Sequence, residues 1–292
     1  MTPTTNPTLQ NGLNSTPKRS VGSDILAVTT IVALAAAQWF RPHLLANEAV
    51  YLIPPLQWWD AGLLATDWTW GGDPWRSTSL LFAWLAAPLW ALSDTPEVVA
   101  MIGRLLSYTA LAVSWLSLCR ALHLGRRATV LAAALFLWSG QGYAAGEWMF
   151  LGFERKPFAH AAAMASVAAL LRRHYTAAGL WTGLSIAFHI LVGGWFGLAT
   201  GAAMLAMWPV VGARNLVRFG AGAVGVAAPF AAMSVVYLFA GATDAESAVA
   251  AAQLGTSAQT AEPGFATWLG TAFRNPHHTI PLHFLPGTRA LE

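Results

Sequence analysis

Charged side chains are scarce in this chain of 292 residues. Asp, Glu, Lys and Arg make up 10% of it, against about 25% in soluble domains. Together with 56% hydrophobic residues and a mean hydropathy of +0.50, this excludes an ordinary soluble domain and indicates a polytopic membrane protein. The net charge of +3 is too small to indicate a nucleic-acid partner.

Cysteine is almost absent, and several enzyme motifs are missing. A single cysteine, Cys119, excludes a disulfide framework and a zinc cluster built on thiolates, so we predict a buried apolar role for it. The sequence contains no P-loop, no dinucleotide-binding fingerprint, no H-E-x-x-H and no G-x-S-x-G. The helix expected between Gly201 and Met207 lacks the buried acid–histidine chain that would mark a proton-coupled transporter.

Long apolar runs predict an all-α polytopic membrane bundle with about seven transmembrane helices. The polar segment 1–21 is expected to be a disordered cytoplasmic tail, followed by a retained signal anchor. The predicted spans are 22–40, 98–119, 129–145, 158–171, 177–191, 193–210 and 216–240.

The apolar run 79–92 is short and contains Pro88, so it is predicted to lie at the membrane surface. With that assignment, the inner segments contain Lys and Arg residues but no Asp or Glu. Short cytoplasmic loops of membrane proteins are enriched in Lys and Arg. These basic residues are Lys18, Arg19, Arg120, Arg126, Arg127, Arg172, Arg173, Arg214 and Arg218. The amino terminus is therefore predicted inside. Segment 41–97 becomes an outer loop with interfacial helices, and 241–292 an outer carboxy-terminal loop that we expect to be truncated.

Three carboxylates and four tryptophans are mixed in the first outer loop, in LLANEAVYLIPPLQWWDAGLLATDWTW at 44–70. Tryptophan rings prefer the headgroup level, so this segment is predicted to hold an interfacial helix. Glu48 would then lie at the water-lined mouth of the bundle and stay ionised. The same surface would carry the outer segment GEWMFLGFERKP at 146–157.

The order of these motifs resembles the GT-C superfamily of polytopic glycosyltransferases, over roughly 25–150. Glu48 corresponds to the family's acidic position, Arg104 to an arginine that opens the second span, and Gly125-Arg126-Arg127 to a basic inner turn. Four blocks also resemble an uncharacterised bacterial membrane-protein group within that superfamily. They are Ala46-Asn47-Glu48, Glu154 to Ala159, His189 to Trp195, and Arg274-Asn275-Pro276-His277-His278.

The resemblance implies transfer of a sugar from a polyprenyl-phosphate donor to an acceptor outside the cytoplasm, in a bacterial plasma membrane. Glu48 and Asp67 are the candidate catalytic carboxylates, because a general base must lie within hydrogen-bonding reach of the acceptor hydroxyl. The candidate residues for binding the polyprenyl-phosphate sugar could bind its phosphate directly, or bind a group that does so. They are Arg104, Glu154, Lys156, His189, Arg274, His277 and His278.

Simpler roles stay open for several of these residues. Glu48 could cap a helix or pair with a surface arginine, Arg104 could form a structural pair with an outer-loop carboxylate, and His189 could make a structural hydrogen bond. The cofactor is left unknown; a divalent cation would need two or three converging carboxylates. The rival functions are a transporter or flippase of a lipid-linked or amphiphilic solute, and a non-enzymatic membrane assembly subunit.

Overall fold

A computed structural model describes residues 21–45, 47–60, 80–139 and 149–233. All regular secondary structure in these ranges is helical, which confirms the predicted all-α class for this part of the chain. The helices are α2 (Val21–Trp39), α3 (Glu48–Gln57), α4 (Leu80–Trp90), α5 (Pro96–Ala121), α6 (Arg126–Trp138), α7 (Arg155–Leu171), α8 (Tyr175–Phe188), α9 (Ile190–Ala206), α10 (Trp208–Val211) and a further helix at Ala213–Met233.

Three of these helices are long and apolar enough to cross a membrane: α2, α5 and Ala213–Met233. They are compatible with a membrane protein. The other predicted spans fall on α6, α7, α8 and α9, which have 13, 17, 14 and 17 residues. Because a span needs about 20 residues to cross some 30 Å of hydrocarbon, the count of seven stays a prediction.

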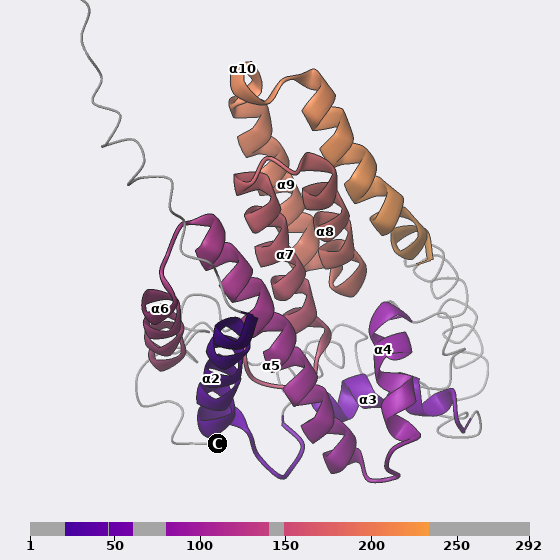
Figure 1. Cartoon of the computed structure of the whole chain (residues 1–292). Coiled ribbons are helices and arrows are strands. Elements are labelled where there is room, and N and C mark those ends of the chain that lie inside the picture. Colours follow the sequence, from indigo (N-terminus) through magenta and orange to yellow (C-terminus); the bar gives the residue numbers. More distant parts are fainter. Residues whose placement is uncertain (1–20, 46, 61–79, 140–148, 234–292) are drawn as a thin grey trace, which may run out of the picture.

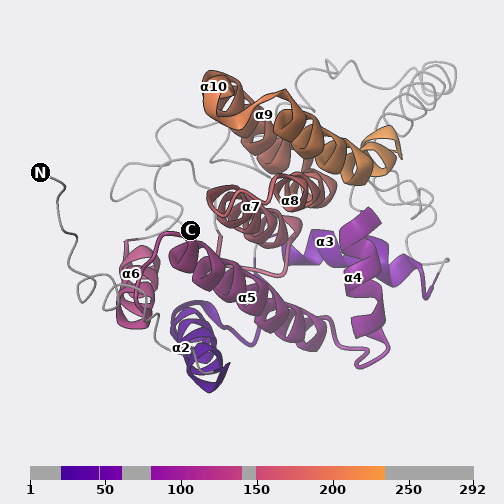
Figure 2. The same cartoon turned by 45° about the horizontal axis from the view of Figure 1, so that its top comes forward.

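The longest helix among the described residues, α5, is the central element. It packs against α2 on one side and α7 on the other, while α6 packs mainly on α2 and α8 on α7 (Figures 1 and 2). The short run predicted to lie at the surface forms α4, an 11-residue helix interrupted by Pro88. It packs on α3 and on the amino-terminal part of α5. Cys119 is buried near the end of α5, as predicted.

The described basic turns lie at one end of the bundle, which we call the basic end. Asp24 at the start of α2 pairs with Arg120 and Arg126, at the end of α5 and the start of α6. Arg172, after α7, donates to the hydroxyl and carbonyl oxygens of Ser117 at 3.1 and 2.7 Å. An apolar cluster joins the end of α7 to the start of α8, to α10 and to the start of Ala213–Met233.

The opposite end carries α3, α4, the start of α5 and the loop at 149–154 (Figure 1). The sequence predicted that the basic turns would share one side, and their contacts agree with that grouping. Which side of a membrane the basic end faces stays a prediction. The predicted tail up to residue 20, the loop 61–79 and the segment 234–292 lie outside the described residues.

Glycines let α8 and Ala213–Met233 pack backbone to backbone. A Cβ atom added at Gly183 would lie 2.5 Å from the carbonyl oxygen of Ala223, and one added at Gly222 would lie 2.8 Å from that of Thr176. A Cβ at Gly179 would overlap the carbonyl oxygen of Phe219. Small residues at such contacts are typical of membrane helix pairs, because dispersion contacts replace the hydrophobic effect there.

We therefore predict that Gly179→Ala lowers the free energy of unfolding by about 1–3 kcal/mol, the usual range for overpacking. The two helix backbones would have to separate to admit the methyl group. Thermal unfolding in detergent measures the effect. Gly225→Ala is the matched control, since a Cβ there meets nothing within 4 Å, and it should leave stability unchanged or slightly higher. Equal behaviour of the two variants would contradict the close helix contact.

Candidate functional site

The site is built on one face of α5. Ala100, Gly103, Arg104, Ser107 and Tyr108 recur at helical spacing, and all are buried. The side chain of Arg104 has no exposed surface. A guanidinium without water must be paired and hydrogen-bonded, because its charge is otherwise strongly destabilising.

Glu48, the first residue of α3, supplies that pairing. Its carboxylate is also fully buried. The guanidinium of Arg104 meets it in a two-pronged arrangement: Nε donates to Oε1 at 2.6 Å and Nη2 donates to Oε2. This fork geometry is the one in which arginine binds carboxylates most tightly.

The pair also binds the backbone of two loops. Arg104 donates to the carbonyl oxygens of Arg41 and His43, in the connection between α2 and α3. The carboxylate of Glu48 accepts the backbone N–H of Leu45 at 2.7 Å and that of Phe153 at 2.6 Å. Two residues therefore fix the α2–α3 connection, α3, α5 and the 149–154 loop to one another.

The 149–154 loop is held by further contacts. The hydroxyl of Tyr108 donates to the carbonyl oxygen of Leu151 at 2.8 Å. The ring of Phe153 lies where any side chain at position 103 would be, so Gly103 is needed for this approach. That ring also packs on Phe82 of α4, with centroids 4.8 Å apart. Aromatic packing thus closes the loop over the ion pair and excludes water from it.

The prediction that Glu48 lies beside water is wrong, because these two loops cover it. Each carboxylate oxygen already accepts two hydrogen bonds, so no lone pair points to a substrate. The structural ion pair that the sequence left open for Arg104 matches this geometry. Proton abstraction by Glu48 would require the pair to open first.

Two further predicted residues adjoin the pair. Glu154, directly after Phe153, is buried at the start of α7, and Lys156 in the first turn of that helix is half-buried. Between them, the guanidinium of Arg155 lies 4.9 Å from the ring centroid of Tyr51 in α3, a cation–π contact. Glu154 and Lys156 therefore follow, within three residues, the Phe153 N–H that Glu48 binds.

His189 lies at the same end but has a local role. It is the N-cap of α9, and its Nδ1 accepts the backbone N–H of Val192 at 3.3 Å. The preceding residue, Phe188, stacks on Phe158 at 5.3 Å, which joins this turn to the aromatic cluster. The structural hydrogen bond left open for His189 is present. Asp67, Arg274, His277 and His278 lie outside the described residues.

Sequence reasoning missed the partners that come from backbone. The site is completed by the carbonyl oxygens of Arg41 and His43 and by the N–H of Phe153. No side-chain motif in the sequence indicates these backbone partners. The glycine before Arg104 was the available signal, since it marks a close approach to the helix. In the described part of the chain, no three His, Cys, Asp or Glu side chains gather to hold a metal ion.

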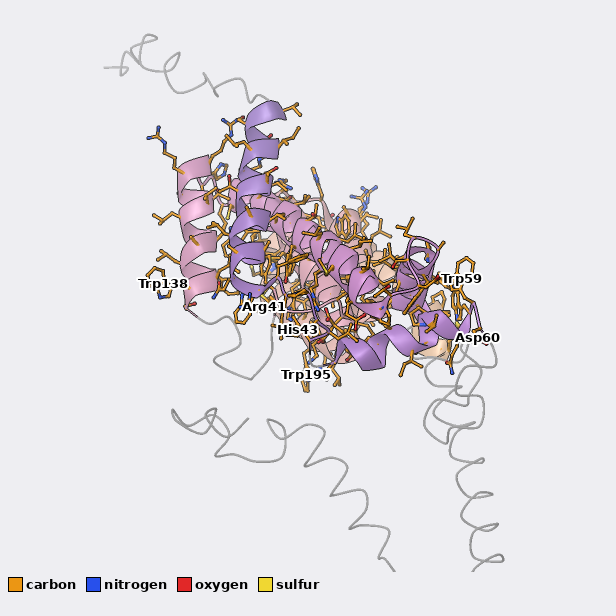
Figure 3. All side chains as sticks on the ribbon, turned by 90° about the horizontal axis from the view of Figure 1, so that it is seen from below. Arg41, His43, Trp59, Asp60, Trp138 and Trp195 are labelled. Atoms are coloured by element: carbon orange, nitrogen blue, oxygen red, sulfur yellow. The ribbon has the colours of Figure 1, made fainter. Side chains whose placement is uncertain are left out.

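The surface around this end is exposed and aromatic (Figure 3). Arg41, His43, Trp195, Trp59 and Asp60 all lie on it. Trp59 donates its indole N–H to the carbonyl oxygen of Ala87 at 2.8 Å, which ties α3 to α4 just before Pro88.

Beside that bond is an open pocket of about 310 Å³. It is lined by Trp58, Trp59, Trp84, Ala87 and Pro88.

Comparison with known proteins adds no relative. No protein-family model, no curated protein and no solved structure matches the chain.

Proposed function

We propose that the protein is a membrane glycosyltransferase of the GT-C type, which moves a sugar from a polyprenyl phosphate to an extracytoplasmic acceptor. The observation that supports it best is the division of the bundle into two ends. One end carries the basic turns. The other holds a buried acid–arginine pair under two loops, with Glu154 and Lys156 beside it. A lipid-linked phosphate would reach such an end from the outer leaflet.

In this proposal the Glu48–Arg104 pair positions the loops, and other groups perform the chemistry. The acceptor hydroxyl oxygen attacks the anomeric carbon, and the bond from that carbon to the phosphate oxygen breaks. The hydroxyl proton passes to a carboxylate, for which Asp67 is the candidate that the pair leaves available. Lys156, Arg274, His277 and His278 would stabilise the departing polyprenyl phosphate, as cationic or donor groups do in phosphate chemistry.

The topology that goes with this function has seven spans, with the basic end facing the cytoplasm of a bacterial cell. The positive-inside rule supports that orientation, because the described turns at the basic end contain seven arginines and Asp24 is the only carboxylate there. The interfacial helices α3 and α4 would then lie at the outer headgroup level, where tryptophans such as Trp59 and Trp84 are favoured.

The test is transfer by the wild-type protein in proteoliposomes that contain a sugar-labelled polyprenyl phosphate and a soluble acceptor. We expect the label to appear in a new glycosidic product and free polyprenyl phosphate to accumulate. If the intact donor crosses the bilayer without cleavage, the protein is a flippase and the proposal is wrong. Neither cleavage nor movement with any of several donor sugars would favour an assembly subunit.

A further inference from the structure

The basic end contains two kinds of arginine. Arg120 and Arg126 share the carboxylate of Asp24, so their charges are partly neutralised. Arg173, Arg214 and Arg218 are exposed, and among the described residues no carboxylate pairs with them. Exposed positive charges that no described carboxylate neutralises, at one end of an apolar bundle, attract an anionic partner.

The helix packing places these three arginines close together. Thr176 and Gly179 of α8 contact the helix Ala213–Met233 at Gly222 and Phe219, and Gly183 contacts it further along at Ala223. The two helices therefore run in the same direction, and the first turn of α8 lies beside residues 219–222 of the other helix. Arg218 is exposed and directly precedes the buried Phe219, which contacts Gly179 of α8. Arg173 immediately precedes α8, and Arg214 lies in the first turn of the other helix.

Exposed apolar side chains surround this cluster. Leu171, Leu180, Trp208, Val210 and Val217 are each between 47% and 68% exposed. Both α10, which carries Trp208 and Val210, and the end of α7 lie at this end (Figure 1). A soluble anion would leave these side chains in water, whereas a membrane surface would cover them and supply phosphate to the arginines.

We infer that Arg173, Arg214 and Arg218 bind the phosphodiester headgroups of anionic phospholipids in the leaflet at the basic end. Guanidinium groups grip phosphate oxygens with two parallel hydrogen bonds. Basic groups between transmembrane helices are a known kind of anionic-lipid site. This inference does not depend on glycosyl transfer, since it concerns the other end of the bundle.

The experiment uses the full chain in a nonionic maltoside detergent, with thermal unfolding followed as short-chain lipid is added. The probes are dioctanoyl phosphatidylglycerol and dioctanoyl phosphatidylcholine, which share their chains and differ in headgroup charge. We expect phosphatidylglycerol alone to raise the unfolding temperature. In Arg173→Gln/Arg214→Gln/Arg218→Gln its apparent affinity should fall at least tenfold, since each surface charge contributes roughly fivefold.

Three controls test whether the effect comes from the charges of these arginines and from the lipid headgroup. Arg173→Lys/Arg214→Lys/Arg218→Lys keeps the charges and should retain most of the affinity, while Arg41→Gln at the opposite end should retain all of it. Inorganic phosphate at the same concentration should not stabilise the protein. If the glutamine variant does not fold, 0.5 M salt should still weaken the phosphatidylglycerol effect on the wild type. Equal effects of the two lipids, or stabilisation by inorganic phosphate alone, would overturn the inference.

Discussion

Arg104→Met is expected to lower the free energy of unfolding by about 3–5 kcal/mol, the usual cost of removing one partner of a buried ion pair. Glu48 would remain fully buried with its charge uncompensated. The carbonyl oxygens of Arg41 and His43 would also lose their donor. Thermal or denaturant unfolding in detergent, with size-exclusion profiles to detect loss of folded protein, measures the effect.

The double variant Glu48→Met/Arg104→Met separates charge from hydrogen bonding. Replacing both partners removes the uncompensated charge, which is often neutral when the new side chains pack well. Here four backbone groups would lose their partners, at Arg41, His43, Leu45 and Phe153. We therefore expect the double variant to recover only part of the loss.

Arg104→Lys is the conservative control. Lysine keeps the positive charge but lacks the planar fork, so it can meet Glu48 and at most some of the backbone carbonyls. It should be less stable than the wild type and more stable than Arg104→Met. If Arg104→Met unfolds at the wild-type temperature, the pair does not hold the loops together and the site described above is incorrect.

The helices were the most predictable part of the structure, because apolar runs are a local property. The run 98–119 became α5 at Pro96–Ala121, and the short run 79–92 became α4 at Leu80–Trp90, with neither helix displaced. The grouping of the basic turns was also predictable. Arginine is costly within hydrocarbon and collects at helix ends on one side, and the contacts of Asp24 and Arg172 agree with this.

The burial of Glu48 was not predictable in the same way. Its environment depends on Phe153, which is 105 positions away, and on a ring that fits only because residue 103 is glycine. Hydrophobic periodicity locates helices but does not say how a loop closes over a charge. The sequence left open an arginine partner for Glu48 and a carboxylate partner for Arg104, without assigning the two to each other. It also predicted that the Glu48 carboxylate lies beside water, which the two loops exclude.

This burial decides which carboxylate should be tested as the base. Asp67→Asn is expected to lower the rate of sugar transfer by about 10²–10⁴, the contribution of general acid–base catalysis, with no change in unfolding temperature. Asparagine keeps the size of aspartate but cannot accept the acceptor's proton. The rate is measured as labelled glycoside formed in proteoliposomes at saturating donor.

Asp60→Asn is the matched control, since Asp60 is exposed in the same outer loop, just after α3, and should leave the rate within about twofold. Glu48→Gln should instead lower activity and unfolding temperature together, because the amide can keep some of the hydrogen bonds but not the charge opposite Arg104. A Glu48→Gln protein that is fully stable yet inactive, beside an active Asp67→Asn protein, would reverse the assignment. It would show that the ion pair opens during turnover and that Glu48 itself takes the proton.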